Sequence, residues 1–162
     1  MVKTVQAHKP VGETVEWLTP PEIIQELGPF DLDPCTPINR PWDTASVHYN
    51  RLDDGLSKEW FGRIWVNPPY SAKDCDIWME RFHKHGNGMA LVFARTETKW
   101  FFKWGWTSDL LLFPEGRLYF YKPDGTRASG NAGHGSVILA MGDECVDKLY
   151  NSSIKGARVK LS

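Results

Sequence analysis

The sequence predicts an α/β fold in one domain, with a mostly parallel sheet flanked by helices and an antiparallel hairpin near the C-terminus. A length of 162 residues suits one domain with a single core. Short apolar runs of strand length recur after helical stretches, as in parallel sheets. Late in the chain, Lys122-Pro123-Asp124-Gly125 has the composition of a tight turn, which predicts the hairpin.

The first predicted helix has clear start and stop signals. Thr19 is a candidate N-cap, and prolines directly after it suit the first turn of a helix over residues 22–27. Gly28-Pro29 then ends this helix. Residues 1–15 lack periodicity, so we expect an N-terminal arm or a loose first strand there.

The remaining elements are predicted from apolar runs and helical spacing. Alternating apolar and acidic residues indicate a first strand over 30–33, ended by Asp33-Pro34-Cys35. Further strands are predicted over residues 45–49, 64–66, 88–94, 110–113, 116–121 and 135–141. Helices are predicted over residues 72–85, 99–106 and 145–150. The basic tail after them is expected to be frayed.

A strand that ends in Asn67-Pro68-Pro69-Tyr70 is the strongest functional signal. Proline lacks a backbone N–H and biases the preceding residue away from helix, so the strand stops here. Ligands bind at such carboxyl ends in open α/β sheets. The Asn67 side-chain oxygen and the Pro68 carbonyl suit an exocyclic amine, and Tyr70 can stack on its base. The plain alternative is a Pro-Pro turn with Tyr70 as ordinary packing.

Five segments in the same order resemble the short Dam-like DNA N6-adenine methyltransferases of phages and prophages. Their sequences are Glu16-Trp17-Leu18-Thr19-Pro20-Pro21-Glu22, Phe30-Asp31-Leu32-Asp33-Pro34-Cys35, Asp53-Asp54-Gly55-Leu56, Trp60-Phe61-Gly62-Arg63-Ile64-Trp65-Val66-Asn67-Pro68-Pro69-Tyr70-Ser71 and Gly116-Arg117-Leu118-Tyr119-Phe120. The resemblance implies a Rossmann-like methyltransferase domain over residues 16–162. It also implies transfer of a methyl group from S-adenosylmethionine to the N6 amine of an adenine flipped out of double-stranded DNA, in a bacterial cytoplasm.

The resemblance also implies two sets of site residues. The catalytic set is Asn67, Pro68, Pro69 and Tyr70. The cofactor-binding set is Trp17, Thr19, Pro20, Asp33, Pro34, Cys35, Asp53, Asp54, Leu56 and Asn67. The alternative for Thr19, Asp33 and the Asp53-Asp54-Gly55 turn is plain capping or turn formation, although we favour the functional interpretation for Asp33. The chain departs from the wider superfamily because its cofactor loop, Cys35-Thr36-Pro37-Ile38, has no glycine for a close backbone approach.

A formal net charge of −1 means that any DNA contact must come from a local patch. The candidates interleave with aromatic residues, as in a phosphate track with stacking platforms, and are Arg95, Lys99, Lys103, Arg117, Lys122 and Arg127. The alternative is a solvated surface over core aromatics. A hairpin over residues 114–134 is the candidate for target recognition, since no separate recognition domain fits in this length.

The sequence also argues against several classes of protein. Three well-separated cysteines suit reduced thiols better than a disulfide framework. No apolar run approaches the roughly 18 residues of a membrane span. His83 and His85 lie two residues apart on a predicted helix, which does not place them on one face for a metal. The open alternatives are a non-catalytic nucleic-acid-binding module on a decayed methyltransferase, or methylation of cytosine N4, RNA or a protein glutamine.

Overall fold

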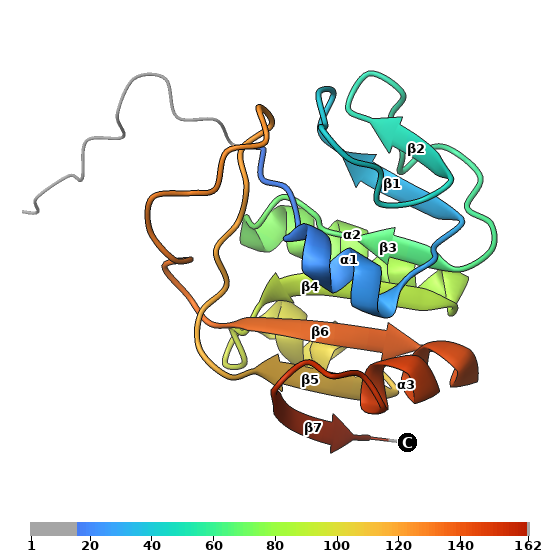
Figure 1. The fold of residues 1–162 in the computed structure, drawn as a ribbon. Helices are drawn as coiled ribbons and strands as arrows, with labels where there is room; N and C mark the ends of the chain where they lie inside the picture. The colour runs from blue at the N-terminus through green and yellow to red at the C-terminus, as the bar shows by residue number, and fades with distance from the viewer. Residues whose placement is uncertain (1–15, 162) are drawn as a thin grey trace, which may run out of the picture.

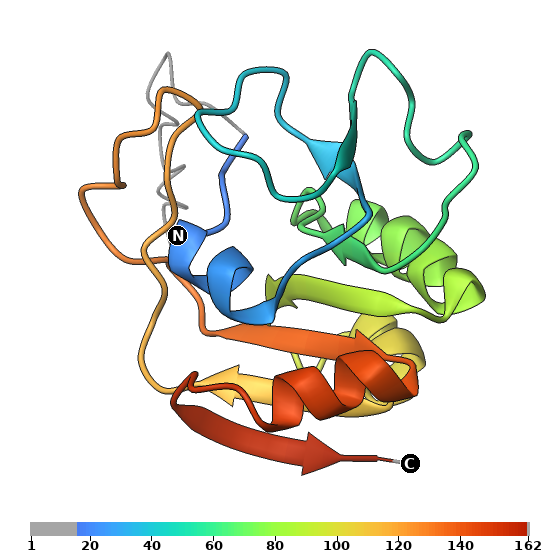
Figure 2. The ribbon, with the colours of Figure 1, turned by 45° about the vertical axis from the view of Figure 1, so that its right-hand side comes forward.

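The computed structural model describes residues 16–161, so the predicted arm over residues 1–15 lies outside the described part. One mixed sheet has the strand order β2-β1-β3-β4-β6-β5-β7. Helices cover both of its faces (Figures 1 and 2). The strands are β1 Leu32–Thr36, β2 Val47–Asn50, β3 Ile64–Val66, β4 Gly88–Phe93, β5 Leu110–Pro114, β6 Ser136–Met141 and β7 Gly156–Lys160. The helical elements are α1 Pro21–Leu27, α2 Ala72–His85, η1 Phe101–Gly105 and α3 Asp143–Tyr150.

Neighbouring strands are parallel in the first half of the sheet and antiparallel in the second. β2, β1, β3 and β4 run parallel to one another. β6 is antiparallel to β4 and to β5, and β7 is antiparallel to β5. The predicted α/β class, with a parallel part and a C-terminal antiparallel part, is therefore confirmed.

Side chains alternate between the two faces of the central strands and build two hydrophobic clusters. Ile64 and Val66 join the cluster under α2 and η1, whereas Trp65 between them joins the cluster under α1 and α3. All three are fully buried, as expected for strands covered on both faces. The tight packing on both sides fixes the end of β3, and with it the Asn-Pro-Pro-Tyr turn.

The first strand and the first helix differ from their predictions. Asp33-Pro34-Cys35 lies inside β1 instead of ending it. The register shifts between Asp33 and Thr36, and such a bulge accommodates Pro34, which cannot donate to a ladder. Thr19 does not cap α1: Pro20 occupies the N-cap, and the Thr19 hydroxyl accepts a hydrogen bond from Trp65 Nε1 at 3.2 Å.

The C-terminal third holds three further corrections. The predicted strand over 116–121 is wrong: the turn forms, but Tyr121 makes only isolated bridges, to Arg127 and to Leu18. The tail is not frayed, because it pairs with β5 as strand β7. α3 begins at Asp143, two residues earlier than predicted.

Candidate active site

The reversal of strand order places a crevice between β1 and β3. From β1 the chain moves outward to β2 and then returns to β3 on the opposite side of β1. Both strands point toward the same edge, so their connections separate there, and ligands of open α/β sheets bind at such a point. A cavity of about 650 Å³ opens at this edge, a size typical of cofactor and substrate sites.

The cavity wall combines residues from both strand ends with two neighbouring segments. Asn67, Pro68, Pro69 and Tyr70 line it after β3, and Pro34 and Cys35 line it from β1. The other lining residues are Glu16, Trp17, Thr36, Pro37, Asn50, Arg51, Asp54, Gly55 and Trp78. Residues separated by as many as 62 positions therefore converge on one space, as a ligand site requires.

Asn67 is a polar residue of this wall whose amide is hydrogen-bonded at both ends. Its Nδ2 donates to the Trp17 carbonyl at 3.3 Å, and its Oδ1 accepts a hydrogen bond from the Tyr70 hydroxyl. These two contacts fix which way the amide faces, because one end can only donate and the other only accept. An amide oxygen has two lone pairs, so Oδ1 retains one acceptor position beside the Tyr70 hydroxyl.

Tyr70 is held by its ring as well as by its hydroxyl. Its ring centroid lies 4.1 Å from that of Phe93 at the end of β4, with an interplanar angle of 33°, and 6.1 Å from that of Phe120. Burial raises the pKa of the Tyr70 hydroxyl well above its ordinary value, so it remains a donor to Asn67. Tyr70 is thus both part of the packing and part of the cavity wall.

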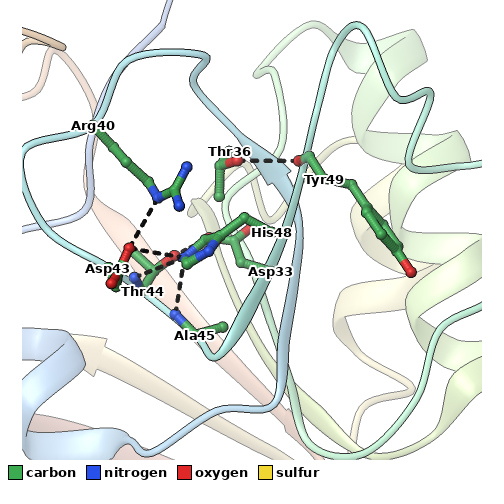
Figure 3. Close-up of polar contacts among 8 residues, drawn as sticks. All are labelled: Asp33, Thr36, Arg40, Asp43, Thr44, Ala45, His48 and Tyr49. Atoms are coloured by element: carbon green, nitrogen blue, oxygen red, sulfur yellow. Dashed lines mark hydrogen bonds and ion pairs between the residues drawn. The ribbon is translucent and has the colours of Figure 1, made fainter.

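A buried carboxylate lies on the β1 side of the same crevice. Asp33 is 3% exposed; its Oδ2 accepts from the Thr44 hydroxyl at 2.5 Å and its Oδ1 from the Cys35 N–H at 3.0 Å. Burial raises the pKa of Asp33 to about 6, although both hydrogen bonds and the nearby Arg40 act in the opposite direction. Figure 3 shows this carboxylate within a polar cluster formed by β1, β2 and the loop between them.

The loop between β1 and β2 is anchored by His48. The unprotonated His48 Nε2 accepts the backbone N–H groups of Thr44 and Ala45, at 3.2 and 3.3 Å. Burial lowers the pKa of His48, which favours this neutral form. Since Thr44 also bonds Asp33, the loop end and the carboxylate form one unit (Figure 3).

The predicted cofactor residues divide into three groups. Trp17, Pro34, Cys35, Asp54 and Asn67 line the 650 Å³ cavity. Thr19 and Asp33 line a smaller void of about 10 Å³ beside it. Among the described residues, Pro20, Asp53 and Leu56 line neither space. Asp53 bonds the Asn50 N–H at 2.9 Å, and Leu56 packs against the core.

The predicted DNA-binding residues are exposed and belong to two segments. Arg95, Lys99 and Lys103 follow β4; Arg95 pairs with Glu97 at 3.5 Å and Lys103 with Asp76 at 3.7 Å. The second segment, residues 115–135, carries the others, which are Arg117, Lys122 and Arg127. It connects β5 to β6 and runs along the carboxyl edge of β3 and β4 (orange in Figure 1).

The 115–135 segment contacts the end of β4 and the ring of Tyr70. The Ala94 N–H donates to the Gly135 carbonyl at 2.8 Å, and the Phe93 and His134 rings lie 5.3 Å apart. Arg127 stacks on Tyr119, 4.1 Å from the ring centroid. The segment therefore borders the cavity wall formed by Tyr70 without being a regular hairpin.

Sequence reasoning missed several site residues. Arg40, Asn50, Arg51 and Thr44 lie in stretches that the sequence marks only as turn-forming connections. The role of the Trp17 carbonyl was also missed, because backbone groups leave no signal in residue identity. A charged residue between two turn prolines, as in Arg40-Pro41 after Pro37, was the one available hint.

Metal-ligating clusters and membrane-spanning helices are both missing from the described residues. Among residues 16–161, no group of three or more His, Cys, Asp or Glu side chains is placed to hold a metal ion. Within that same range, no helix has the length and apolar character needed to cross a membrane.

The fold and the position of the crevice together indicate the class of protein. The mixed sheet, with its parallel half and a cavity at the reversal of strand order, is consistent with a Rossmann-like methyltransferase. The family model described as DNA N-6-adenine-methyltransferase (Dam) matches residues 6–153. The chain belongs to this family of DNA N6-adenine methyltransferases. Searches of curated proteins and of solved structures found no match.

Proposed function

We propose that this DNA adenine methyltransferase uses S-adenosylmethionine, bound in the cavity between β1 and β3, and acts site-specifically on an adenine flipped out of the duplex. The observation that most directly supports this proposal is that Asn67 lines the 650 Å³ cavity and that Trp17 and Tyr70 fix the orientation of its amide. Flipping costs a few kcal/mol, which contacts in the site must offset.

The residues around the cavity fit the proposed cofactor. Asp33 offers a buried carboxylate beside Asn67 for an ammonium group, and Asp54 with Asn50 offers polar partners for an adenosine. Trp17 and Trp78 supply apolar surface. When bound, S-adenosylmethionine supplies an electrophilic methyl group on a sulfonium. The missing glycine loop is compatible with this fit because Pro34 and Cys35, at the register shift in β1, line the cavity directly.

Asn67 and Pro68 would act by orienting the target amine. The adenine amine would donate one hydrogen bond to the free lone pair of Asn67 Oδ1 and the other to the Pro68 carbonyl oxygen. These contacts would draw the amine out of conjugation and orient its lone pair toward a bound methyl donor. Tyr70, supported by Phe93, would stack on the base and return about 1–3 kcal/mol. Catalysis then consists mainly of orientation and preorganised hydrogen bonding.

Neither Asn67 nor Cys35, which both line the cavity, is suited to act as a strong base. Asn67 is neutral at every accessible pH. Burial raises the pKa of the Cys35 thiol well above its ordinary value, so it stays protonated. The adenine nitrogen becomes acidic once it is methylated, and its extra proton leaves to water. The predicted mechanism therefore needs no titrating catalytic group near neutral pH.

DNA recognition is assigned to the two basic segments. Arg95, Lys99 and Lys103 are exposed residues that follow β4, and the 115–135 segment adds the second set of cations. Their exposure suits phosphate contacts, which position a duplex without reading its sequence. Exposed aromatic Tyr119, covered on one face by Arg127, lies within the same segment.

A direct test is expression of the protein in a methylation-deficient host, followed by analysis of the DNA for N6-methyladenine. We expect N6-methyladenine in a defined sequence context with the wild type and none with Asn67→Ala. Methylation of cytosine N4 or of RNA alone would contradict the proposed substrate. Wild-type protein that neither methylates DNA nor binds S-adenosylmethionine in calorimetry would instead support a non-catalytic binding module.

A further inference from the structure

Arg40 is a loop residue whose guanidinium makes few hydrogen bonds to the described part of the chain. It lies between β1 and β2, and its Nε–H donates to Asp43 Oδ1 at 3.2 Å. The Asp43 side chain is 76% exposed, so this ion pair is in contact with solvent and contributes little. Within the described residues, the two terminal nitrogens of the guanidinium make no hydrogen bond. Arg40 therefore has most of its donor capacity available.

The Arg40 side chain borders the small void that also contains Asp33 and Asn67 at its wall. The void measures about 10 Å³, enough for roughly one water. The void adjoins the 650 Å³ cavity, because five residues line both spaces: Trp17, Cys35, Thr36, Pro37 and Asn67. Asp33 and Arg40 therefore lie directly behind residues that also form the wall of the large cavity.

The surrounding loop is anchored well enough to present Arg40 reproducibly. Thr44 bonds Asp33, and His48 accepts the N–H groups that follow, so the loop end is fixed to β1 and β2. Figure 3 shows Arg40 and Asp43 on this same loop, beside the Asp33–Thr44–His48 cluster. Within the described residues, Asp33 has no cation at ion-pair distance, and Arg40 is the cation whose charge acts on it.

We propose that Arg40 binds the α-carboxylate of the methyl donor while Asp33 binds its α-ammonium group. This inference rests on the proposed use of S-adenosylmethionine. An α-amino acid carries both charges on one carbon, and the void offers a carboxylate and a guanidinium on its wall. Arg40 exchanges its exposed contact with Asp43 for a carboxylate, which a guanidinium can bind through two parallel hydrogen bonds. Arg40 is thus a cofactor-binding residue that the sequence did not indicate.

The test compares two ligands that differ only in the carboxylate. Calorimetric dissociation constants are measured for S-adenosylmethionine and for decarboxylated S-adenosylmethionine, with wild type, Arg40→Gln and Arg40→Lys. We expect Arg40→Gln to weaken S-adenosylmethionine about 10- to 100-fold, the range for losing a hydrogen bond to a charged group. Its affinity for the decarboxylated ligand should stay within about twofold of wild type. Arg40→Lys, which keeps the charge, should recover part of the loss.

Arg51→Gln is the matched control, because Arg51 lines only the large cavity and is exposed. It should change the affinities of both ligands by the same factor. Thermal unfolding of each variant verifies that it is folded. An equal loss of both ligands in Arg40→Gln, or no loss at all, would overturn the assignment of Arg40. Failure of the wild type to bind either ligand would instead reject S-adenosylmethionine as the donor.

Discussion

Replacement of Asn67 by Ala tests the central contact of the site. The change removes the Oδ1 acceptor and the Nδ2 donor to Trp17, and it leaves the Tyr70 hydroxyl without its acceptor. Loss of one preorganised hydrogen-bonding group costs about 10²- to 10³-fold in kcat. Leaving a buried hydroxyl unpaired costs about 1–3 kcal/mol of folding free energy. The variant should therefore lose both activity and stability.

A second variant separates these two effects. Asn67→Ala with Tyr70→Phe removes the unpaired hydroxyl but keeps the ring that packs on Phe93. Its thermal midpoint should recover most of the loss, at about 2–4 °C per kcal/mol for a chain of this size. Its kcat should remain as low as that of Asn67→Ala, because the acceptor for the adenine amine is still missing.

The assay measures transfer of a labelled methyl group to duplex DNA under single-turnover conditions, and calorimetry follows cofactor binding in parallel. Ser71→Ala is the control, since Ser71 caps α2 through the Asp74 N–H at 3.0 Å and lies just beyond the motif. It should lose about 1 kcal/mol of stability with kcat unchanged. Turnover by Asn67→Ala within tenfold of wild type would refute the orienting role of Asn67.

Three further predictions follow from the same geometry. Because burial raises the pKa of Asp33 from 3.8 to about 6, the folded state binds more protons than the unfolded chain between these values. The free energy of unfolding should therefore fall as pH rises through this window, whereas cofactor affinity should rise as Asp33 ionises. Asp33→Asn should remove both pH dependences, which are measured by unfolding and by calorimetry at a series of pH values. Phe93→Leu removes the aromatic support of Tyr70 and should weaken binding of an adenine-containing duplex about 2- to 10-fold in fluorescence anisotropy; unchanged affinity would show that Tyr70 does not stack on the base. A triple alanine variant of the 115–135 cations Arg117, Lys122 and Arg127 should weaken DNA binding and reduce the slope of log K against log salt by up to about 3. The control is a triple alanine variant of three exposed lysines outside this segment, Lys58, Lys84 and Lys148, and an equal effect in this control would count against the proposed surface.

Elements with buried apolar runs could be predicted from the sequence. The strand before Asn67 is fully buried on both faces, and α2 has both a Ser71 cap and a left-handed Gly86 at its end, so local signals and packing agree. The position of the Asn-Pro-Pro-Tyr turn was predicted for the same reason, because its prolines follow the end of β3 where the sequence indicates. Residue identity and tertiary structure carry the same information at these positions.

The incorrect predictions concern segments whose partners are distant in sequence. Residues 116–121 alternate like a strand, but Tyr121 makes only isolated bridges, to Leu18 and to Arg127 after the turn. The charged tail forms β7 because its backbone pairs with β5. Arg158 in this strand also bonds the carbonyls of Tyr150, Ser152 and Ile154, contacts that composition does not reveal. Long-range pairing therefore overrides local preference in both cases.

The proposed cofactor cavity and the proposed recognition segment are held by the same backbone contacts. Leu18 follows Trp17, whose carbonyl holds Asn67, and Leu18 pairs with Tyr121 in both directions, at 2.7 and 3.1 Å. Tyr121 in turn meets Trp42 edge to face at 5.2 Å, on the loop that carries Arg40. A ligand that moves Arg40 or Trp17 therefore acts on backbone that also positions Tyr121. Because both binding surfaces depend on these few contacts, occupancy of the cofactor cavity should change the affinity for DNA, and DNA should change the affinity for cofactor by the same factor.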